Sequence, residues 1–208
     1  MKLFLASALD KMKDQLLAEV GSLQGKKIAY ITNPADPYIE KSWPNQWRLK
    51  NDKEMLLAFG AELIPVDLRV VQHDALSLAL GDSQGVYVSG GKTYYFLQLA
   101  DASWFTTLIS AWVATPGNVY MGSSAWSCIM GKQIKYLEDG REKFALFEGF
   151  GMVEATLLPH WWAEWSWEEY QKTLNHFYAE GLSLITLTDQ QALVVDEHGM
   201  RIVTAASK

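Results

Sequence analysis

The sequence predicts an α/β fold, a three-layer αβα sandwich with a mostly parallel central sheet. Strand-like and helix-like segments alternate almost from one end of the 208 residues to the other, as in parallel sheets covered by helices on both faces. Hydrophobic residues make up 49% and charged residues 20% of the chain, which is typical of globular proteins. No internal repeat, low-complexity tract or linker divides the sequence. We therefore expect residues 1–208 to form a single α/β domain.

The first half of the chain contains short apolar segments that are bounded by turn residues. We expect strands at residues 2–7, 26–33, 61–68 and 85–91. Helices are expected between them, at residues 10–23, 47–60 and 73–84. The first helix has Met12, Leu16 and Val20 at helical spacing, and Gly60 is a candidate C-cap of the second. Three prolines and an aspartate within residues 34–44 predict a loop.

The second half continues the alternation. Residues 93–117 carry one or two helices, and residues 118–124 form a fifth strand that runs into a tight turn and a further helix. Three more strands are expected near the end, at residues 183–188, 191–197 and 200–205. A turn at residues 197–199 joins the last two, so these strands form an extension or an antiparallel edge of the sheet.

The charge and composition exclude several functional classes. The net charge is -6, whereas proteins that bind the nucleic-acid backbone need a basic face, so we expect no nucleic-acid partner. No apolar stretch approaches the roughly 20 residues that a membrane span requires. The apolar residues 3–9 after Lys2 permit a signal-peptide interpretation, but Asp10 and Lys11 break the run and favour a first strand. The single Cys128 fits a reducing compartment, and we expect a cytoplasmic protein.

No cofactor is expected. No cluster of His, Cys and carboxylate residues has the spacing of metal ligands, so we expect no metal. The sequence also lacks a glycine-rich phosphate-binding loop of the nucleotide type.

The stretch VYMGSSAWSCIMG, residues 119–131, contains a candidate catalytic residue. It places a serine at the corner between a strand and a helix. A sharp corner would expose the Ser124 hydroxyl and direct the Ala125 amide at the same point, where an oxyanion could form. The pair Gly90 and Gly91 ends another strand, and it would let a second backbone N–H approach from the other side. Carboxyl ends of parallel strands are where α/β sheets bind ligands.

A serine nucleophile needs a base, and His160 is the candidate among the four histidines. It follows a strand-like run and a proline in ATLLPHWW, so it also lies at the carboxyl end of a strand. The other histidines, His73, His176 and His198, lie in polar helix-like or turn-like settings.

Four segments, VSGGKTYYFLQL, YMGSSAWSCIMGKQIKY, GFGMVEATLLPHW and TLTDQQALVV, occur in the order and spacing of the peptidase E family. The chain resembles these aspartyl dipeptidases over most of its length. They are relatives of cyanophycinase, with a sheet similar to that of class I glutamine amidotransferases. The resemblance implies a serine hydrolase of small peptides that prefers an N-terminal aspartate, with a cation near the site that no motif places here.

The resemblance also implies a role for each site residue. Ser124 is the nucleophile that forms an acyl-enzyme, and His160 is the base. The acidic third member falls on Asp139, with Glu138 beside it as the alternative. The oxyanion donors would be the backbone amides of Gly91 and Ala125.

The sequence departs from the family at two positions beside these residues. Relatives continue Ser-Ala-Gly where this chain has Trp126, and they have GGNT where it has Lys92. Trp126 could fill the substrate pocket, form one wall of a reshaped pocket, or pack outward without effect. We assign Lys92, Trp126 and Trp161 to the substrate pocket.

Trp161 belongs to a tryptophan-rich segment, residues 161–167, that either packs a helix, lines the mouth of the cleft or contacts another protein. The alternative to a peptidase is a non-catalytic homologue that binds a small molecule or a partner protein, and another amide or ester hydrolysis on the same scaffold stays open. We expect a monomer or a homodimer.

Overall fold

The computed structural model describes residues 1–39, 46–134, 148–161 and 167–206. Its main sheet has seven strands in the order β3-β2-β4-β5-β1-β8-β9. The first five run parallel, whereas β8 is antiparallel to both β1 and β9. The strands of this sheet are β1 (Leu3–Ala6), β2 (Lys27–Ile31), β3 (Glu62–Pro65), β4 (Gly85–Val88), β5 (Val119–Ser123), β8 (Gln191–Asp196) and β9 (Gly199–Thr204).

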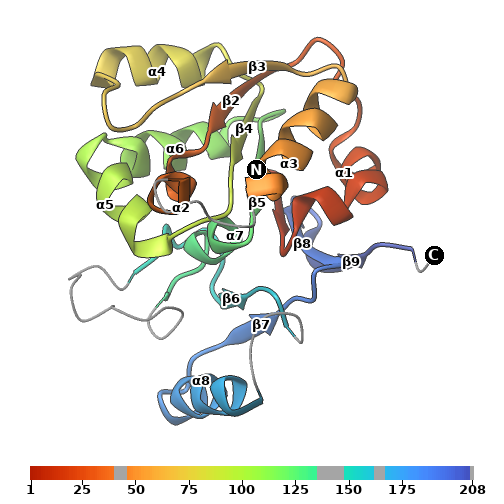
Figure 1. The fold of residues 1–208 in the computed structure, drawn as a ribbon, viewed down its shortest axis with the longest axis vertical. Coiled ribbons are helices and arrows are strands. Elements are labelled where there is room, and N and C mark those ends of the chain that lie inside the picture. Colours follow the sequence, from red (N-terminus) through yellow and green to blue (C-terminus); the bar gives the residue numbers. More distant parts are fainter. Residues whose placement is uncertain (40–45, 135–147, 162–166, 207–208) are drawn as a thin grey trace.

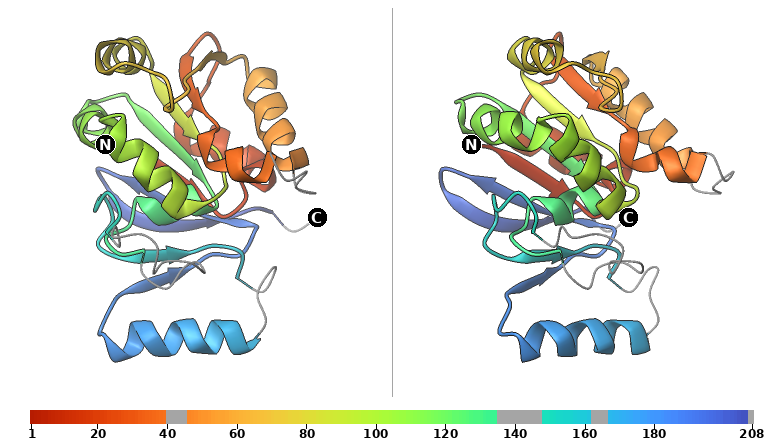
Figure 2. Two further views of the ribbon diagram at one scale, coloured as in Figure 1. Left: turned by 60° about the vertical axis from the view of Figure 1, so that its left-hand side comes forward. Right: turned by 90° about the vertical axis from the view of Figure 1, so that its left-hand side faces the viewer.

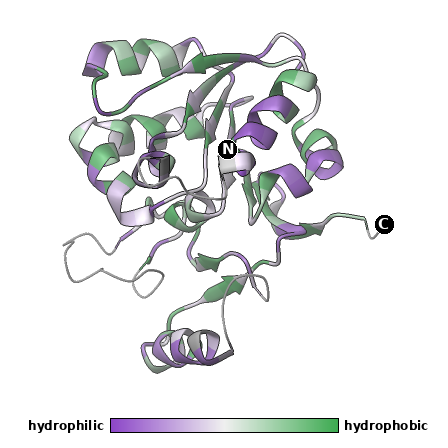
Figure 3. Ribbon diagram, in the orientation of Figure 1, coloured by the Kyte–Doolittle hydropathy of each residue, from purple (hydrophilic) through white to green (hydrophobic). Residues whose placement is uncertain are grey.

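Helices cover both faces of this sheet, with α4, α5 and α6 on one side and α1 and α3 on the other (Figure 1). The helices are α1 (Lys13–Val20), α2 (Asp36–Ile39), α3 (Gln46–Ala58), α4 (His73–Gly81), α5 (Thr93–Ala102), α6 (Phe105–Ala114), α7 (Ala125–Ile129) and α8 (Trp167–Ala179). They carry both hydrophilic and hydrophobic residues (Figure 3), as helices with one buried face do. The predicted three-layer αβα sandwich is confirmed.

Strand β1, an interior strand of the sheet, explains why the layers form. All four of its residues are fully buried. Because side chains alternate along a strand, Leu3 and Leu5 enter the core under α4 to α6, and Phe4 and Ala6 enter the core under α1 and α3. An apolar run of this kind is stable only where helices cover both faces of the sheet.

The predicted end of the second helix is confirmed at Gly60. Gly60 has a φ of 81°, a left-handed conformation that glycine adopts without strain. The Gly60 N–H donates to the Leu57 carbonyl at 2.9 Å, and the Ala61 N–H donates to the Leu56 carbonyl at 3.1 Å. This pair of bonds is a Schellman motif, which satisfies carbonyls that the end of α3 would leave unpaired.

The predicted loop at residues 34–44 is wrong at its start. A 3-10 turn (Asn33–Ala35) leads directly into the one-turn helix α2. Pro34 lies in the first turn, where its missing N–H costs no helical hydrogen bond. Residues 40–45 lie outside the described part of the chain.

The C-terminal third contains a second sheet that the sequence did not predict. Strand β6 (Thr156–Leu158) pairs in parallel with β7 (Leu184–Thr186), and neither belongs to the main sheet. Helix α8, to which the sequence assigned no element, packs beyond this pair (Figures 1 and 2). The expected antiparallel edge is therefore made by β8 and β9 alone.

No helix in the part of the chain that the structure describes has both the length and the apolar character needed to cross a membrane.

The buried carboxyl of Asp52 predicts a pH-dependent stability. Asp52 lies on α3 and accepts a hydrogen bond of 2.6 Å from the Tyr87 hydroxyl, and burial raises its pKa to about 7. Between the pKa of the unfolded chain, about 4, and this value, the folded state holds a proton that the unfolded state releases, so stability falls as pH rises. We expect Asp52→Asn to raise the free energy of unfolding relative to wild type by roughly 2–4 kcal/mol at pH 8 and by much less at pH 4.5. Urea unfolding of both proteins at pH 8 and pH 4.5 measures the effect. The same difference in free energy of unfolding between variant and wild type at both pH values would contradict the prediction.

Candidate active site

Ser124 occupies a strained corner between β5 and α7. Its backbone has φ 59° and ψ -120°, a combination that non-glycine residues rarely adopt and that concentrates at functional sites. Its N–H donates to the Ala6 carbonyl at 3.0 Å, which anchors the corner to the end of β1. A Cβ on Gly122 would lie 3.1 Å from the Trp126 backbone, so glycine at this position lets α7 fold back closely against β5.

The imidazole of His160 reaches Ser124 from the chain after β6. Ser124 Oγ and His160 Nε2 are 2.6 Å apart. His160 also has a positive φ of 58°, and two hydrogen bonds hold it there. Its N–H donates to Ser7 Oγ at 2.8 Å, and its carbonyl accepts from the Tyr170 hydroxyl at 2.6 Å. The structure thus brings Ser124 and His160 together as predicted, although β6 belongs to the second sheet.

The carboxylate that contacts His160 is Asp189, on the turn between β7 and β8. Asp189 Oδ1 lies 2.6 Å from His160 Nδ1 and accepts a hydrogen bond of 3.1 Å from Ser7 Oγ. Burial acts to raise the pKa of Asp189, but the hydrogen bond and charge of His160, together with Arg48, outweigh it and lower the pKa below its ordinary value. Asp189 is therefore ionised at neutral pH. The predicted third member, Asp139, and its alternative Glu138 lie outside the described residues.

Two backbone amides are candidates to stabilise an oxyanion beside Ser124. Ala125 is the first residue of α7, so its N–H has no acceptor within the helix. A Cβ on Gly90 would lie 3.1 Å from Ser124 Cβ and 3.7 Å from Ser124 Oγ, so the loop after β4 runs against the serine. Gly91 follows in that loop, packed so closely that a Cβ there would lie 2.1 Å from the Pro34 carbonyl oxygen. The two strand ends therefore converge, as the sequence predicted.

Trp126 does not line the site, which corrects its assignment to the substrate pocket. The side chain has no exposed surface, and it packs in the core edge to face with Phe96 of α5. Because Gly122 already provides the close approach between β5 and α7, residue 126 can carry a large side chain that turns toward α5.

The other two residues that the sequence assigned to the pocket remain partly exposed. The Lys92 ammonium lies 5.4 Å from the centre of the Tyr38 ring, and the Lys92 N–H donates to the Pro34 carbonyl at 2.9 Å. Trp161 packs against Tyr170, with their ring centres 4.2 Å apart.

Sequence reasoning missed three residues around His160, namely Asp189, Ser7 and Arg48. Arg48 Nη2 lies 3.8 Å from Asp189 Oδ2, which brings a cation to the site from α3. Asp189 lies within TLTDQQALVV, and Ser7 directly follows the first strand, so both had a local signal as polar residues at strand ends. Arg48 had no signal that distinguished it from other helical cations.

Together these contacts can move a proton. With the Asp189 carboxylate accepting from Nδ1–H, His160 Nε2 is left as an acceptor for the Ser124 hydroxyl proton. No three His, Cys, Asp or Glu side chains in the described ranges gather closely enough to hold a metal ion.

Known proteins similar to this chain are peptidases. The chain is 26% identical over 200 residues to an uncharacterized peptidase of Pasteurella multocida (strain Pm70), covering 94% of this chain and 93% of that protein. It is 22% identical over 198 residues to an uncharacterized peptidase of Listeria innocua serovar 6a, covering 93% of this chain and 91% of that protein.

Solved structures share the fold. A crystal structure of a protein assigned as peptidase E from Listeria monocytogenes EGD-e matches 99% of this chain and 98% of its own, with a TM-score of 0.86 and 20% identity. A peptidase from an acI-B1 Actinobacterium matches 99% of this chain and 88% of its own, with a TM-score of 0.67 and 20% identity. The family model described as peptidase family S51 matches residues 3–203. The chain belongs to peptidase family S51.

Proposed function

We propose that this protein is a serine hydrolase of small peptides in which Ser124, His160 and Asp189 form the catalytic triad. The observation that carries the proposal is the unbroken series of hydrogen bonds from Ser124 Oγ through the His160 ring to Asp189, each 2.6 Å long. A strained serine with a base in hydrogen-bond reach, and a carboxylate that orients the base, is the general arrangement of an activated nucleophile.

In the proposed reaction, His160 Nε2 takes the proton of Ser124 as Oγ bonds to the peptide carbonyl carbon. The carbonyl oxygen becomes an oxyanion that accepts from the Gly91 and Ala125 amides. His160 then gives its proton to the leaving amine as the peptide bond breaks, which leaves an acyl-enzyme. Water repeats the sequence and releases the acid. Asp189 keeps the imidazole in the productive tautomer throughout and stabilises its charged form.

For the substrate we propose short peptides with an N-terminal aspartate. The support is the resemblance to aspartyl dipeptidases, together with one cation beside Asp189 and a second cation in the loop that carries Gly91. Lys92 directly follows Gly91, and Arg48 lies 3.8 Å from Asp189. Either ammonium or guanidinium group could attract the acidic side chain of a substrate.

A panel of dipeptides tests the proposal. Wild-type protein is incubated with Asp-Leu, Glu-Leu and Ala-Leu, and the released leucine is measured, with Ser124→Ala as the negative control. We expect release from Asp-Leu above the others and only the buffer rate in the control. In parallel, a diphenyl phosphonate should add one phosphonyl group to wild type, at Ser124 by peptide mapping. Equal background release from wild type and control, with no adduct, would rule the proposal out.

The alternative of a non-catalytic homologue rested on Trp126 and Lys92. The Trp126 side chain is fully buried and packs against Phe96, so it no longer supports that alternative. Lys92 is partly exposed, and its cation fits an acidic substrate group as well as it fits an altered site.

Replacing Ser7 tests whether the proposed triad needs support from β1. Ser7 is fully buried, and its hydroxyl accepts from the His160 N–H while donating to Asp189. Ser7→Ala removes both bonds, which loosens the imidazole, so we expect kcat to fall on the order of 10-fold to 100-fold with KM nearly unchanged. Steady-state kinetics on Asp-Leu measure this split. A rise in KM with kcat preserved would mean that Ser7 serves substrate binding instead.

A further inference from the structure

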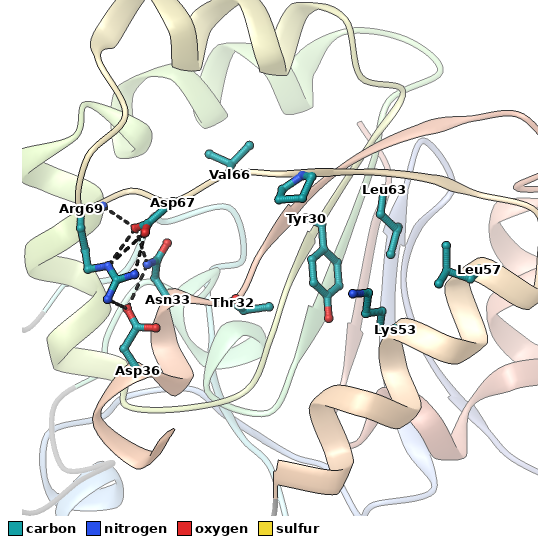
Figure 4. A pocket seen from close by; sticks show the side chains of 11 residues that line it. Tyr30, Thr32, Asn33, Asp36, Lys53, Leu57, Leu63, Val66, Asp67 and Arg69 are labelled. Carbon is teal, nitrogen blue, oxygen red and sulfur yellow. Dashed lines mark hydrogen bonds and ion pairs between the residues drawn. The ribbon is translucent and has the colours of Figure 1, made fainter. Parts of the chain in front are cut away.

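A cavity lies at the edge of the main sheet, between β2, β3 and α3. Its volume is about 440 Å³, and side chains from these elements and from the turns after β2 and β3 line it (Figure 4). Small-molecule sites are commonly clefts of roughly 300–1,000 Å³ with apolar walls and a few polar groups. None of Ser124, His160 and Asp189 lines this cavity, so it is distinct from the proposed active site.

Two hydrogen-bond donors in the lining have no partner among the described residues. Tyr30 is only 9% exposed, yet no hydrogen bond from a described residue reaches its hydroxyl. Burial, and the nearby Asp52 carboxyl, raise the pKa of Tyr30, so the hydroxyl keeps its proton. Lys53 of α3 likewise forms no ion pair within the described ranges, and both side chains line the cavity (Figure 4). A bound carboxylate would accept a hydrogen bond from the Tyr30 hydroxyl and pair with the Lys53 ammonium.

Another part of the lining is acidic and already ordered. Asn33 donates to Asp36 at 3.0 Å and to Asp67 at 2.9 Å. The Arg69 guanidinium donates to both carboxylate oxygens of Asp67, and Arg69 Nη1 lies 3.4 Å from Asp36 Oδ2 (Figure 4). The hydrogen bond from Arg69 holds the pKa of Asp67 well below its ordinary range. Two carboxylates and one guanidinium leave this network a net charge of -1, which favours an incoming cation.

Apolar side chains complete the lining between these polar groups. Leu57 is 48% exposed, and Leu63 and Val66 also contribute to the wall. Leu57 lies four residues after Lys53, so both side chains point from the same face of α3. Covering Leu57 would remove apolar surface from water, which favours binding of a ligand with an apolar body.

From this arrangement we propose that the cavity binds a small zwitterion. The carboxylate of the ligand binds Lys53 and Tyr30, its ammonium binds Asp36 and Asp67, and its apolar body covers Leu57. The required ligand class is an amine and a carboxylate joined by a short apolar chain.

The probe that tests the class is 6-aminohexanoate, with hexanoate and hexylamine as compounds that keep one charge each. Each is titrated into wild-type protein and followed by isothermal titration calorimetry and protein-observed NMR. We expect 6-aminohexanoate to bind at one saturable site and each single-charge compound to bind at least 10-fold more weakly. Binding of hexanoate as tight as that of 6-aminohexanoate would show that the site recognises only the carboxylate, which would overturn the proposal. The absence of saturable 6-aminohexanoate binding would overturn it as well.

Two variants of α3 locate the site. Lys53→Gln removes the charge from an exposed position and is expected to weaken 6-aminohexanoate binding at least 10-fold. Lys50→Gln, three residues earlier and paired with Glu54 at 3.7 Å, is the matched control and should bind as wild type does. Unchanged binding in Lys53→Gln would overturn the proposal.

The Ser124→Ala variant separates this site from the proposed peptidase chemistry. It is expected to bind 6-aminohexanoate as wild type does, because Ser124 does not line the cavity. Loss of binding in Ser124→Ala would place the ligand at the active site and contradict the inference. A failure of dipeptide hydrolysis would leave the binding result unaffected.

Discussion

Replacing Asp189 with asparagine is expected to lower kcat/KM on Asp-Leu by about 10⁴-fold while the fold is kept. The reason is the tautomer of His160. The Asp189 carboxylate accepts at 2.6 Å and fixes the imidazole proton on Nδ1, which leaves Nε2 free to accept from Ser124. An asparagine amide can donate to Nδ1 instead, and the proton then moves to Nε2, where the imidazole can no longer act as a base.

Asp139→Asn is the comparison that distinguishes the two candidate acids. Because Asp189 already occupies the single Nδ1 of His160, we expect Asp139→Asn to change kcat/KM by less than about 10-fold, well short of the loss of a triad carboxylate. Hydrolysis of Asp-Leu by both variants, with circular dichroism to confirm that each is folded, decides between them. A large loss in Asp139→Asn together with a small one in Asp189→Asn would return the third role to Asp139.

The triad shows where sequence reasoning succeeds and where it stops. Ser124 and His160 each follow an apolar segment directly, so local sequence marks both as polar residues at strand ends. Asp189 has a similar local setting in TLTDQQALVV, but nothing local says that it meets His160. That contact depends on β8 pairing antiparallel with β1, which sets Ala192 opposite Ala6 and brings the turn before β8 next to Ser7. Pairing between distant strands is a tertiary property.

The same distinction applies to the fold. The main sheet was predictable because strands such as β1 and β4 are apolar throughout and buried on both faces. The pair β6 and β7 was not, because strands of three residues carry too little periodicity to reveal their partner. Helix α8 was not predicted because the tryptophan-rich residues 161–167, before and at its start, fit aromatic contacts at a cleft or interface as well as they fit a helix.

Trp126→Ala is expected to destabilise the protein by about 3–5 kcal/mol, the range for truncating a large buried aromatic residue. Trp126 is fully buried and packs against Phe96, so its removal leaves a cavity between α7 and α5. In a chain of this size such a loss lowers Tm by roughly 6–20 °C. Thermal unfolding by circular dichroism measures the shift, and hydrolysis of Asp-Leu well below the lowered Tm measures the site separately.

The indole nitrogen makes Trp126→Phe an informative partner of this variant. Trp126 Nε1 is buried and has no hydrogen-bond partner in the described part of the chain, a cost of roughly 1–3 kcal/mol that phenylalanine does not carry. Trp126→Phe should therefore destabilise the protein by no more than about 1–2 kcal/mol, since the smaller ring loses packing but also removes the unpaired donor. Neither variant should change KM, because the residue at position 126 turns away from Ser124. A Trp126→Ala protein with unchanged Tm and a lower KM would place the indole in the substrate pocket after all, and Gly122 would then no longer explain how the chain tolerates tryptophan at that position.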